Sequence, residues 1–186
     1  SVHALVAGGA NLYAGGSFTA AGGTLTDHIA RWDGNRWSSL DTGIDGYVDA
    51  MAWDGTNLYA GGLFDIAGGI PANHVARWNG RGWTALGSGI AVNGRVHALA
   101  WDGTHLYAGG TFDRAGGTAA NNIARWDGSR WTTLGVGVSG RIYALVWDGA
   151  RLYAGGLFNE AGGTPANNVA LWDGSNWSAL GAGTNG

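Results

Sequence analysis

The sequence predicts an all-β protein made of four copies of one repeat of about 46 residues, and three observations lead to this prediction. The same apolar strand motif returns with offsets of 46, 48 and 46 residues, beginning at Val2, Val48, Val96 and Ile142. Glycine supplies 37 of the 186 residues and is spread through every repeat, which suits short strands joined by tight turns. No segment keeps an apolar period of about 3.6 residues over the roughly 11 residues that would indicate a helix.

Each repeat contains two hairpins in series. In the third repeat, the apolar runs 96–101 and 106–112 flank the pair Asp102-Gly103, and the runs 123–126 and 131–134 flank Asp127-Gly128. An Asp-Gly pair between two apolar runs is a strong hairpin signal, because aspartate accepts backbone N–H bonds and glycine supplies the positive φ. We therefore expect a four-stranded antiparallel meander in each repeat, with these aspartates serving the turns.

A sheet of four short strands cannot bury both of its faces alone, so neighbouring repeats must cover one another. For repeats of this size, the usual arrangement is a β-propeller. We expect a single repeat domain, 1–186, with blades at about 2–47, 48–95, 96–141 and 142–186. A small closed ring of four blades is the first expectation, and half of an eight-bladed ring formed by two chains, or a segment of a longer repeat array, is the alternative.

The tryptophans keep a fixed register, which favours packing between blades over stacking on a sugar. One series occupies the third predicted strand and a second series opens the fourth strand. The two series are Trp32, Trp78, Trp126 and Trp172, and Trp37, Trp83, Trp131 and Trp177.

The repeats also resemble a known type. The third repeat reads Leu-Tyr-Ala-Gly-Gly-Thr-Phe from Leu106, then Asn-Ile-Ala-Arg-Trp-Asp-Gly from Asn122, and the others follow closely. This pattern resembles the repeats of secreted bacterial β-propeller proteins and of the fungal cortical cell-polarity marker family. The resemblance covers the whole chain and implies a propeller on an extracellular or surface-anchored protein, but implies little about a ligand.

Composition argues against several classes of function. The net charge is −3 with no basic cluster, so nucleic-acid binding is not expected. No apolar run is long enough for a membrane span, and cysteine is missing, which removes disulfides and thiolate metal sites. The five histidines are scattered and Glu160 is the sole glutamate, so we expect no catalytic residue, no metal site, no cofactor and no enzyme activity.

The connection between the two hairpins of a repeat is the candidate ligand-binding region. It spans ten residues, 113–122 in the third repeat, and polar side chains close it in every copy. Loops held on a rigid scaffold are common binding sites. The candidate ligand-facing residues are Asn73, His74, Asn121, Asn122, Asn167 and Asn168, with Arg95 and Arg141 beside them. The competing interpretation is that these side chains cap the loop backbone.

These observations predict a non-catalytic recognition or adhesion module at the cell surface or outside the cell. Its partner would be a carbohydrate, in a lectin-like manner, or a protein surface. The alternative is a structural repeat of a surface scaffold or fibre, which would self-associate and bind no small ligand.

Overall fold

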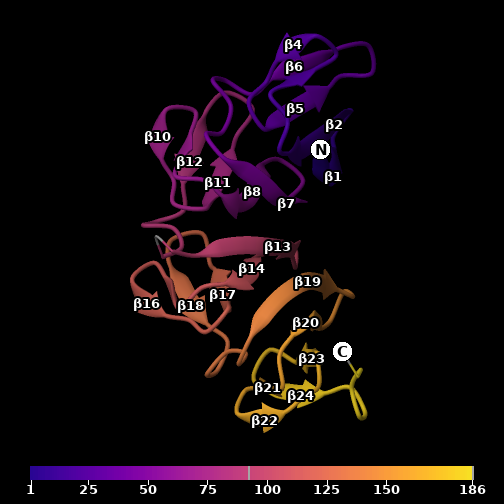
Figure 1. The fold of residues 1–186 in the computed structure, drawn as a ribbon, viewed down its shortest axis with the longest axis vertical. Helices are drawn as coiled ribbons and strands as arrows, with labels where there is room; N and C mark the ends of the chain where they lie inside the picture. Colours follow the sequence, from indigo (N-terminus) through magenta and orange to yellow (C-terminus); the bar gives the residue numbers. More distant parts are fainter. Residues whose placement is uncertain (92, 186) are drawn as a thin grey trace.

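The computed structural model describes residues 1–91 and 93–185, and within them all regular secondary structure is β-strand (Figure 1). Four antiparallel sheets of four strands follow one another along the chain, and in each sheet the strands pair in chain order. The sheets begin within one residue of the predicted starts. The prediction of four four-stranded blades is therefore confirmed.

The four blades have matching strands. The first and innermost strands are β1 (Val2–Gly8), β7 (Tyr47–Trp53), β13 (Arg95–Trp101) and β19 (Arg141–Trp147). The second strands are β2 (Asn11–Gly16), β8 (Leu58–Leu63), β14 (Leu106–Thr111) and β20 (Leu152–Leu157). The third strands are β5 (Ile29–Trp32), β11 (Val75–Trp78), β17 (Ile123–Trp126) and β23 (Val169–Trp172). The outer strands are β6 (Trp37–Ser39), β12 (Trp83–Ala85), β18 (Trp131–Thr133) and β24 (Trp177–Ala179).

The aspartates of the Asp-Gly pairs hold the hairpin turns, as expected. The carboxylate Oδ1 of Asp127 accepts the backbone N–H groups of Ser129 and Arg130 at 2.9 and 2.8 Å. These backbone hydrogen bonds, from Arg130 first, lower the pKa of Asp127 from its ordinary value. In the second blade Asn79 does the same work, accepting from Arg81 and Gly82 at 2.9 and 3.0 Å.

Each ten-residue loop contains a small hairpin that the sequence did not predict. These two-stranded units pair β3 (Ala20–Ala21) with β4 (Thr24–Leu25), β9 (Ile66–Ala67) with β10 (Ile70–Pro71), β15 (Arg114–Ala115) with β16 (Thr118–Ala119), and β21 (Glu160–Ala161) with β22 (Thr164–Pro165). Strands of two residues are too short to show an alternating pattern, so they left no signal in the sequence. Three isolated bridges tie these hairpins to the preceding blade: Ile44 with Ala67, Ile90 with Ala115, and Val138 with Ala161.

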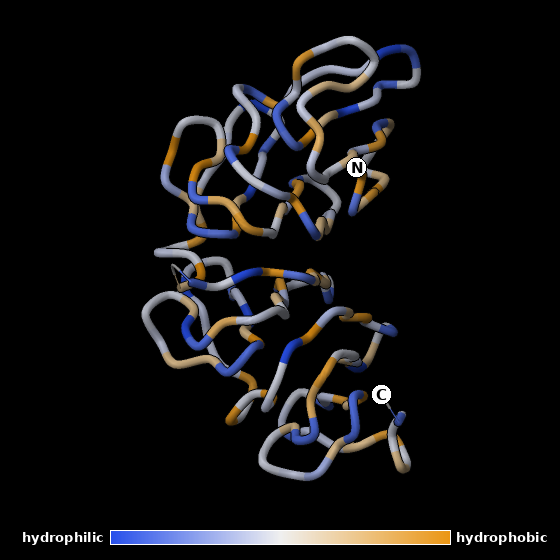
Figure 2. Tube along the Cα trace, viewed as in Figure 1, coloured by the Kyte–Doolittle hydropathy of each residue, from blue (hydrophilic) through white to orange (hydrophobic). Residues whose placement is uncertain are grey.

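Glycine permits the close approach of neighbouring blades. A Cβ atom added to Gly61 of β8 would lie 2.6 Å from Cγ1 of Val96 in the next blade. The same relationship joins Gly15 to Val48 and Gly109 to Ile142. Apolar stretches recur in every blade (Figure 2), and Val48, Val96 and Ile142 are fully buried between blades.

The four blades follow an open arc, with the innermost strands on its concave side and both termini toward the open side (Figure 1). Strand β1 packs on β7, β7 on β13, and β13 on β19. Among the described residues, no comparable packing joins β19 to β1. Our first expectation of a closed four-bladed ring is therefore wrong for this chain. The blade-to-blade step turns the chain too little for four blades to meet.

Candidate functional site

Three blades carry an equivalent hollow at the predicted ligand-binding face. Each hollow is bounded by the end of the second strand, by the residues that close the ten-residue loop, and by the connection from the preceding blade. Its volume is about 200 Å³ in the second blade, 400 Å³ in the third and 710 Å³ in the fourth. Of the residues predicted to face a ligand, His74, Asn121, Asn122, Asn167 and Asn168 line these hollows.

Asn122 and Asn168 hold the loop and the next connection together. The side-chain oxygen of Asn122 accepts the N–H of Phe112 at 3.1 Å, and its amide group donates to the carbonyl of Val138 at 2.9 Å. Asn168 repeats this pattern with Phe158 and Thr184, at 3.2 and 2.9 Å. Both asparagines have positive φ, 63° and 65°, which asparagine tolerates better than most residues.

The remaining loop-closing residues also bond the backbone. His74 is buried and its Nδ1 accepts the N–H of Phe64 at 3.3 Å. The side-chain amides of Asn73, Asn121 and Asn167 donate to the carbonyls of Ser88, Val136 and Ala182 at 2.8 to 3.0 Å. All six predicted residues thus support the loop and its neighbour, while five of them also line a hollow.

The third blade differs in the polar groups that its hollow presents. In the second blade, Asp45 accepts the N–H groups of Asp65 and Ile66, so its carboxylate is engaged by backbone. In the third blade Ala91 takes the place of Asp45, since its N–H donates to the carbonyl of Arg114 as the N–H of Asp45 donates to that of Ile66, and Asn93 follows in the same connection. No hydrogen bond joins the side chain of Asn93 or Asp113 to another described residue. Asp113 is exposed. The hollow of the third blade therefore offers an amide and a carboxylate that are available to a ligand.

Arg95 and Arg141, the two predicted arginines, lie at the start of innermost strands but in different surroundings. Arg95 makes a two-pronged ion pair with Asp49 of the preceding blade, with Nε–Oδ2 at 2.6 Å and Nη2–Oδ1 at 2.9 Å. This hydrogen bonding raises the pKa of Arg95. Arg141 is exposed. Arg95 is thus tied to a neighbouring blade, whereas Arg141 is accessible.

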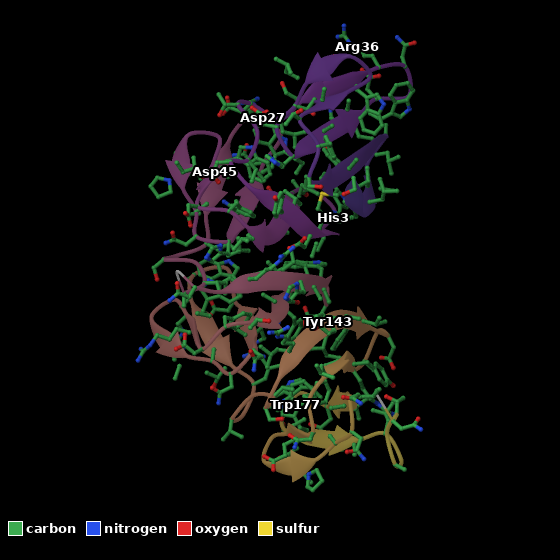
Figure 3. All side chains as sticks on the ribbon, in the orientation of Figure 1. His3, Asp27, Arg36, Asp45, Tyr143 and Trp177 are labelled. Atoms are coloured by element: carbon green, nitrogen blue, oxygen red, sulfur yellow. The ribbon has the colours of Figure 1, made fainter. Side chains whose placement is uncertain are left out.

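A polar cluster that the sequence did not reveal lies on the concave side. His3 Nδ1 lies 3.0 Å from Oδ1 of Asp49, the same carboxylate oxygen that accepts from Nη2 of Arg95. The ring of His97 meets the ring of Tyr143 edge to face at 5.5 Å. Burial, followed by the charge of Arg95, lowers the pKa of His97. Figure 3 shows His3 and Tyr143 on the inner side of the arc. His3, Asp49, His97 and Tyr143 share one repeat position and Arg95 lies two residues before it, and the packing of neighbouring innermost strands brings them together.

The hollows also contain residues that sequence reasoning had not singled out. They are Asp45, Asp65, Asp113, Asn93 and Asn159. Asp65, Asp113 and Asn159 each follow the phenylalanine that comes directly after the second strand, and that shared position is the signal that could have marked them.

No family model and no curated protein matches the sequence of this chain. Solved structures do match its fold. The computationally designed Ika4 protein superposes with a TM-score of 0.60 and 18% identity over 93% of this chain and 91% of that one. The β-propeller domain of the Trilobed protease from Pyrococcus furiosus gives 0.58 and 13% over 94% of this chain and 53% of that one. The GH74 enzyme of Niastella koreensis gives 0.60 and 21% over 95% of this chain and 29% of that one.

Together, the four-stranded blades and these neighbours define the chain as a β-propeller protein. At this level of identity the likeness concerns the fold alone. The chain spans about half of the Pyrococcus domain and less than a third of the Niastella enzyme. Within the described residues, no helix has the length and apolar character needed to cross a membrane.

Proposed function

We propose that this propeller is a non-catalytic recognition or adhesion module of an extracellular or cell-surface protein, and that it binds carbohydrate. The observation that carries the proposal is the repetition of the hollow in three blades, with polar groups at equivalent places. Repeated shallow sites suit a repeating ligand, since individually weak contacts add through multivalency. The resemblance of the repeats to secreted bacterial propellers and to the fungal cortical marker family supports the same location.

The hollow of the third blade has the chemistry that a sugar hydroxyl requires. A hydroxyl group both donates and accepts hydrogen bonds, and the Asp113 carboxylate accepts while the Asn93 amide does both. Of the predicted site residues, Asn121 and Asn122 line the same hollow, and Arg141 lies exposed at the start of the next blade. We assign the ligand contacts mainly to Asp113 and Asn93, because the side chains of Asn121 and Asn122 already bond the loop backbone.

A glycan array probed with the 186-residue chain tests this proposal. We expect binding to a defined set of glycans, and we expect Asp113→Asn to reduce it at least several-fold without changing the melting temperature. The backbone carbonyl of Asp113, which accepts the N–H of Ala120 at 2.8 Å, is unaffected by this substitution. Asp127→Asn makes the same charge change at the turns on the opposite end of the blade and serves as the matched control.

The second candidate function is a structural repeat of a surface scaffold or fibre. It is favoured by the backbone bonds of Asn73, Asn121 and Asn167, which use the amides for loop support. If the chain binds no glycan and forms long polymers under the electron microscope, the recognition proposal is wrong and the scaffold is correct.

A further inference from the structure

We propose that two copies of this chain dock head to tail and close one eight-bladed ring, with the first blade of each copy packed on the fourth blade of the other. The proposal rests on contacts that recur at all three blade boundaries within the chain. At the two ends of the arc, the groups that would make the same contacts have no corresponding partner within the described residues. It concerns the assembly and is independent of the proposed ligand.

The first recurring contact is made at a glycine of the second strand, where the missing side chain leaves room for a valine or isoleucine of the following blade. We call this space the glycine socket. A Cβ on Gly15, Gly61 or Gly109 would collide with the valine or isoleucine of the following blade, at 2.5 to 2.7 Å. The fourth member of this series, Gly155 on β20, would meet nothing within 4 Å. The side chain that fits this socket by repeat equivalence is Val2, which is 55% exposed where Val48, Val96 and Ile142 are fully buried.

A second apolar contact surrounds the same socket. Leu99 and Leu145 pack beside Gly61 and Gly109 of the preceding blade and are 9% and 8% exposed. Their equivalent in the first blade, Leu5, is 62% exposed. On the other end, Val146 of β19 is 58% exposed, although its equivalents Ala52 and Ala100 are covered by the following blade at 7% and 8%. The two ends thus present complementary apolar faces.

The third recurring contact is a hydrogen bond from tryptophan to the preceding blade. The indole Nε1 groups of Trp83, Trp131 and Trp177 donate to the carbonyls of Leu40, Leu86 and Leu134 at 2.9 to 3.1 Å. The fourth donor is Trp37 and the fourth acceptor is the carbonyl of Leu180. They lie at opposite ends of the arc, Trp37 is only half-buried, and no bond from its indole to another described residue is present.

Backbone bonds complete the series. Gly68, Gly116 and Gly162 donate their N–H groups to the carbonyls of Gly43, Gly89 and Gly137 in the preceding blade, each at 2.8 Å. The equivalent pair is the N–H of Gly22 in the first blade and the carbonyl of Gly183 in the fourth. If a second copy packs with the same blade-to-blade geometry, Val2 of one copy meets Gly155 of the other. The indole of Trp37 then reaches the carbonyl of Leu180, and the N–H of Gly22 reaches the carbonyl of Gly183.

Two copies satisfy the geometry of the arc. Both termini lie toward its open side in Figure 1, so the first and fourth blades present their unfilled faces on that side. A second arc related by a twofold axis places its fourth blade against the first blade of this copy, and its first blade against the fourth. Both boundaries are then filled at once and no apolar end remains.

Light scattering after size-exclusion chromatography measures the assembly directly. We expect a mass of about 38 kDa, twice the 19.0 kDa of one chain. A stable 19 kDa species at micromolar concentration, or a broad series of larger polymers, would overturn the closed two-chain ring.

Gly155→Val tests the docking face itself. The added side chain meets open space in the single chain but occupies the socket for Val2 of the second copy. We expect a folded species of about 19 kDa with an unchanged far-UV circular dichroism spectrum. The matched control is Gly82→Val, since a Cβ at this turn glycine also meets nothing within 4 Å and lies away from the blade faces. If Gly155→Val stays dimeric, the interface lies elsewhere and the proposal is wrong.

Indole hydrogen exchange followed by NMR gives an independent result. In the ring, the indole N–H of Trp37 is protected as strongly as those of Trp83, Trp131 and Trp177. In Gly155→Val, Trp37 alone among these four exchanges quickly. Equal exchange of Trp37 in the two proteins would overturn the assignment of its partner.

Discussion

The indole Nε1 of Trp131 donates a hydrogen bond of 2.9 Å to the backbone carbonyl of Leu86, which belongs to the preceding blade. Both residues are buried, at 4% and 2% exposure, so the bond is made away from water. Because the same bond recurs at each boundary within the chain, the tryptophans of the outer strands couple the stability of neighbouring blades.

Replacing Trp131 with phenylalanine should therefore destabilise the protein. The carbonyl of Leu86 loses its side-chain donor in a buried place, which costs about 1–3 kcal/mol of the free energy of unfolding. Urea unfolding monitored by circular dichroism measures this loss. Trp37→Phe in the monomeric Gly155→Val background is the control and should cost less, because Trp37 there has no carbonyl of a preceding blade to bond. Equal losses would contradict the role given to the bond.

Asn122→Ala should lower the melting temperature more than it alters any ligand binding. The substitution removes the bonds to Phe112 and Val138 and places alanine at a φ of 63°. Each lost bond contributes about 0.5–1.5 kcal/mol, and the positive φ adds a further cost. Asn122→Gly should recover part of the loss, since glycine accepts this φ. A melting temperature unchanged by Asn122→Ala, together with lost glycan binding, would place Asn122 in the ligand site.

Asp102→Ala should destabilise the third blade more than Asp102→Asn. The carboxylate accepts backbone N–H groups of Thr104 and His105 at 2.7 and 2.6 Å and the hydroxyl of Tyr107 at 2.9 Å. Alanine leaves these donors without their acceptor, at a cost of about 1–3 kcal/mol. Asparagine keeps an acceptor oxygen, as Asn79 does in the second blade. Denaturant unfolding of the two variants gives the comparison, and equal stabilities would refute the turn role.

Stability should fall in alkali partly through Tyr107. Burial, together with the hydrogen bond and charge of Asp102, raises the pKa of Tyr107 from its ordinary 10.0 to about 12. In the unfolded chain the phenol ionises near pH 10, so its contribution is complete below pH 10 and is lost as the pH rises toward 12. Tyr107→Phe should show a shallower decline of melting temperature across this window. Tyr143→Phe, on the exposed inner strand, controls for loss of a hydroxyl.

Ala7→Trp should strengthen the proposed ring. Tyr13, Tyr59 and Tyr107 stack on Trp53, Trp101 and Trp147 of the following blade, with centroids 5.7, 5.8 and 6.2 Å apart. Tyr153 would meet Ala7 of the second copy, so this boundary lacks one stack. Each of the two boundaries of the ring then gains a stack worth about 0.5–1.5 kcal/mol, so the Kd of the dimer should fall roughly 5- to 160-fold, as measured by sedimentation of a dilution series in the analytical ultracentrifuge. A Kd that is unchanged or higher would argue against this pairing of faces.

The site was only partly predictable. Asn122 and Asn168 were marked by their repeated position at the loop end, and the structure places them in hollows as well as in the backbone bonds of the competing interpretation. The cluster of Asp49, Arg95 and His3 was not predicted, because His3 and Arg95 each lie 46 positions from Asp49 and meet it only through the packing of neighbouring blades.

The sequence by itself determined the blade: repeated Asp-Gly turns specify the hairpins, and the fixed register of apolar residues specifies which faces must be covered. It also placed the blade boundaries to within one residue at the first strands. Only the tertiary structure decided that four blades leave an open arc. The angle between blades follows from how side chains such as Val96 fit against glycines such as Gly61, and this fit depends on three-dimensional packing that no local pattern encodes.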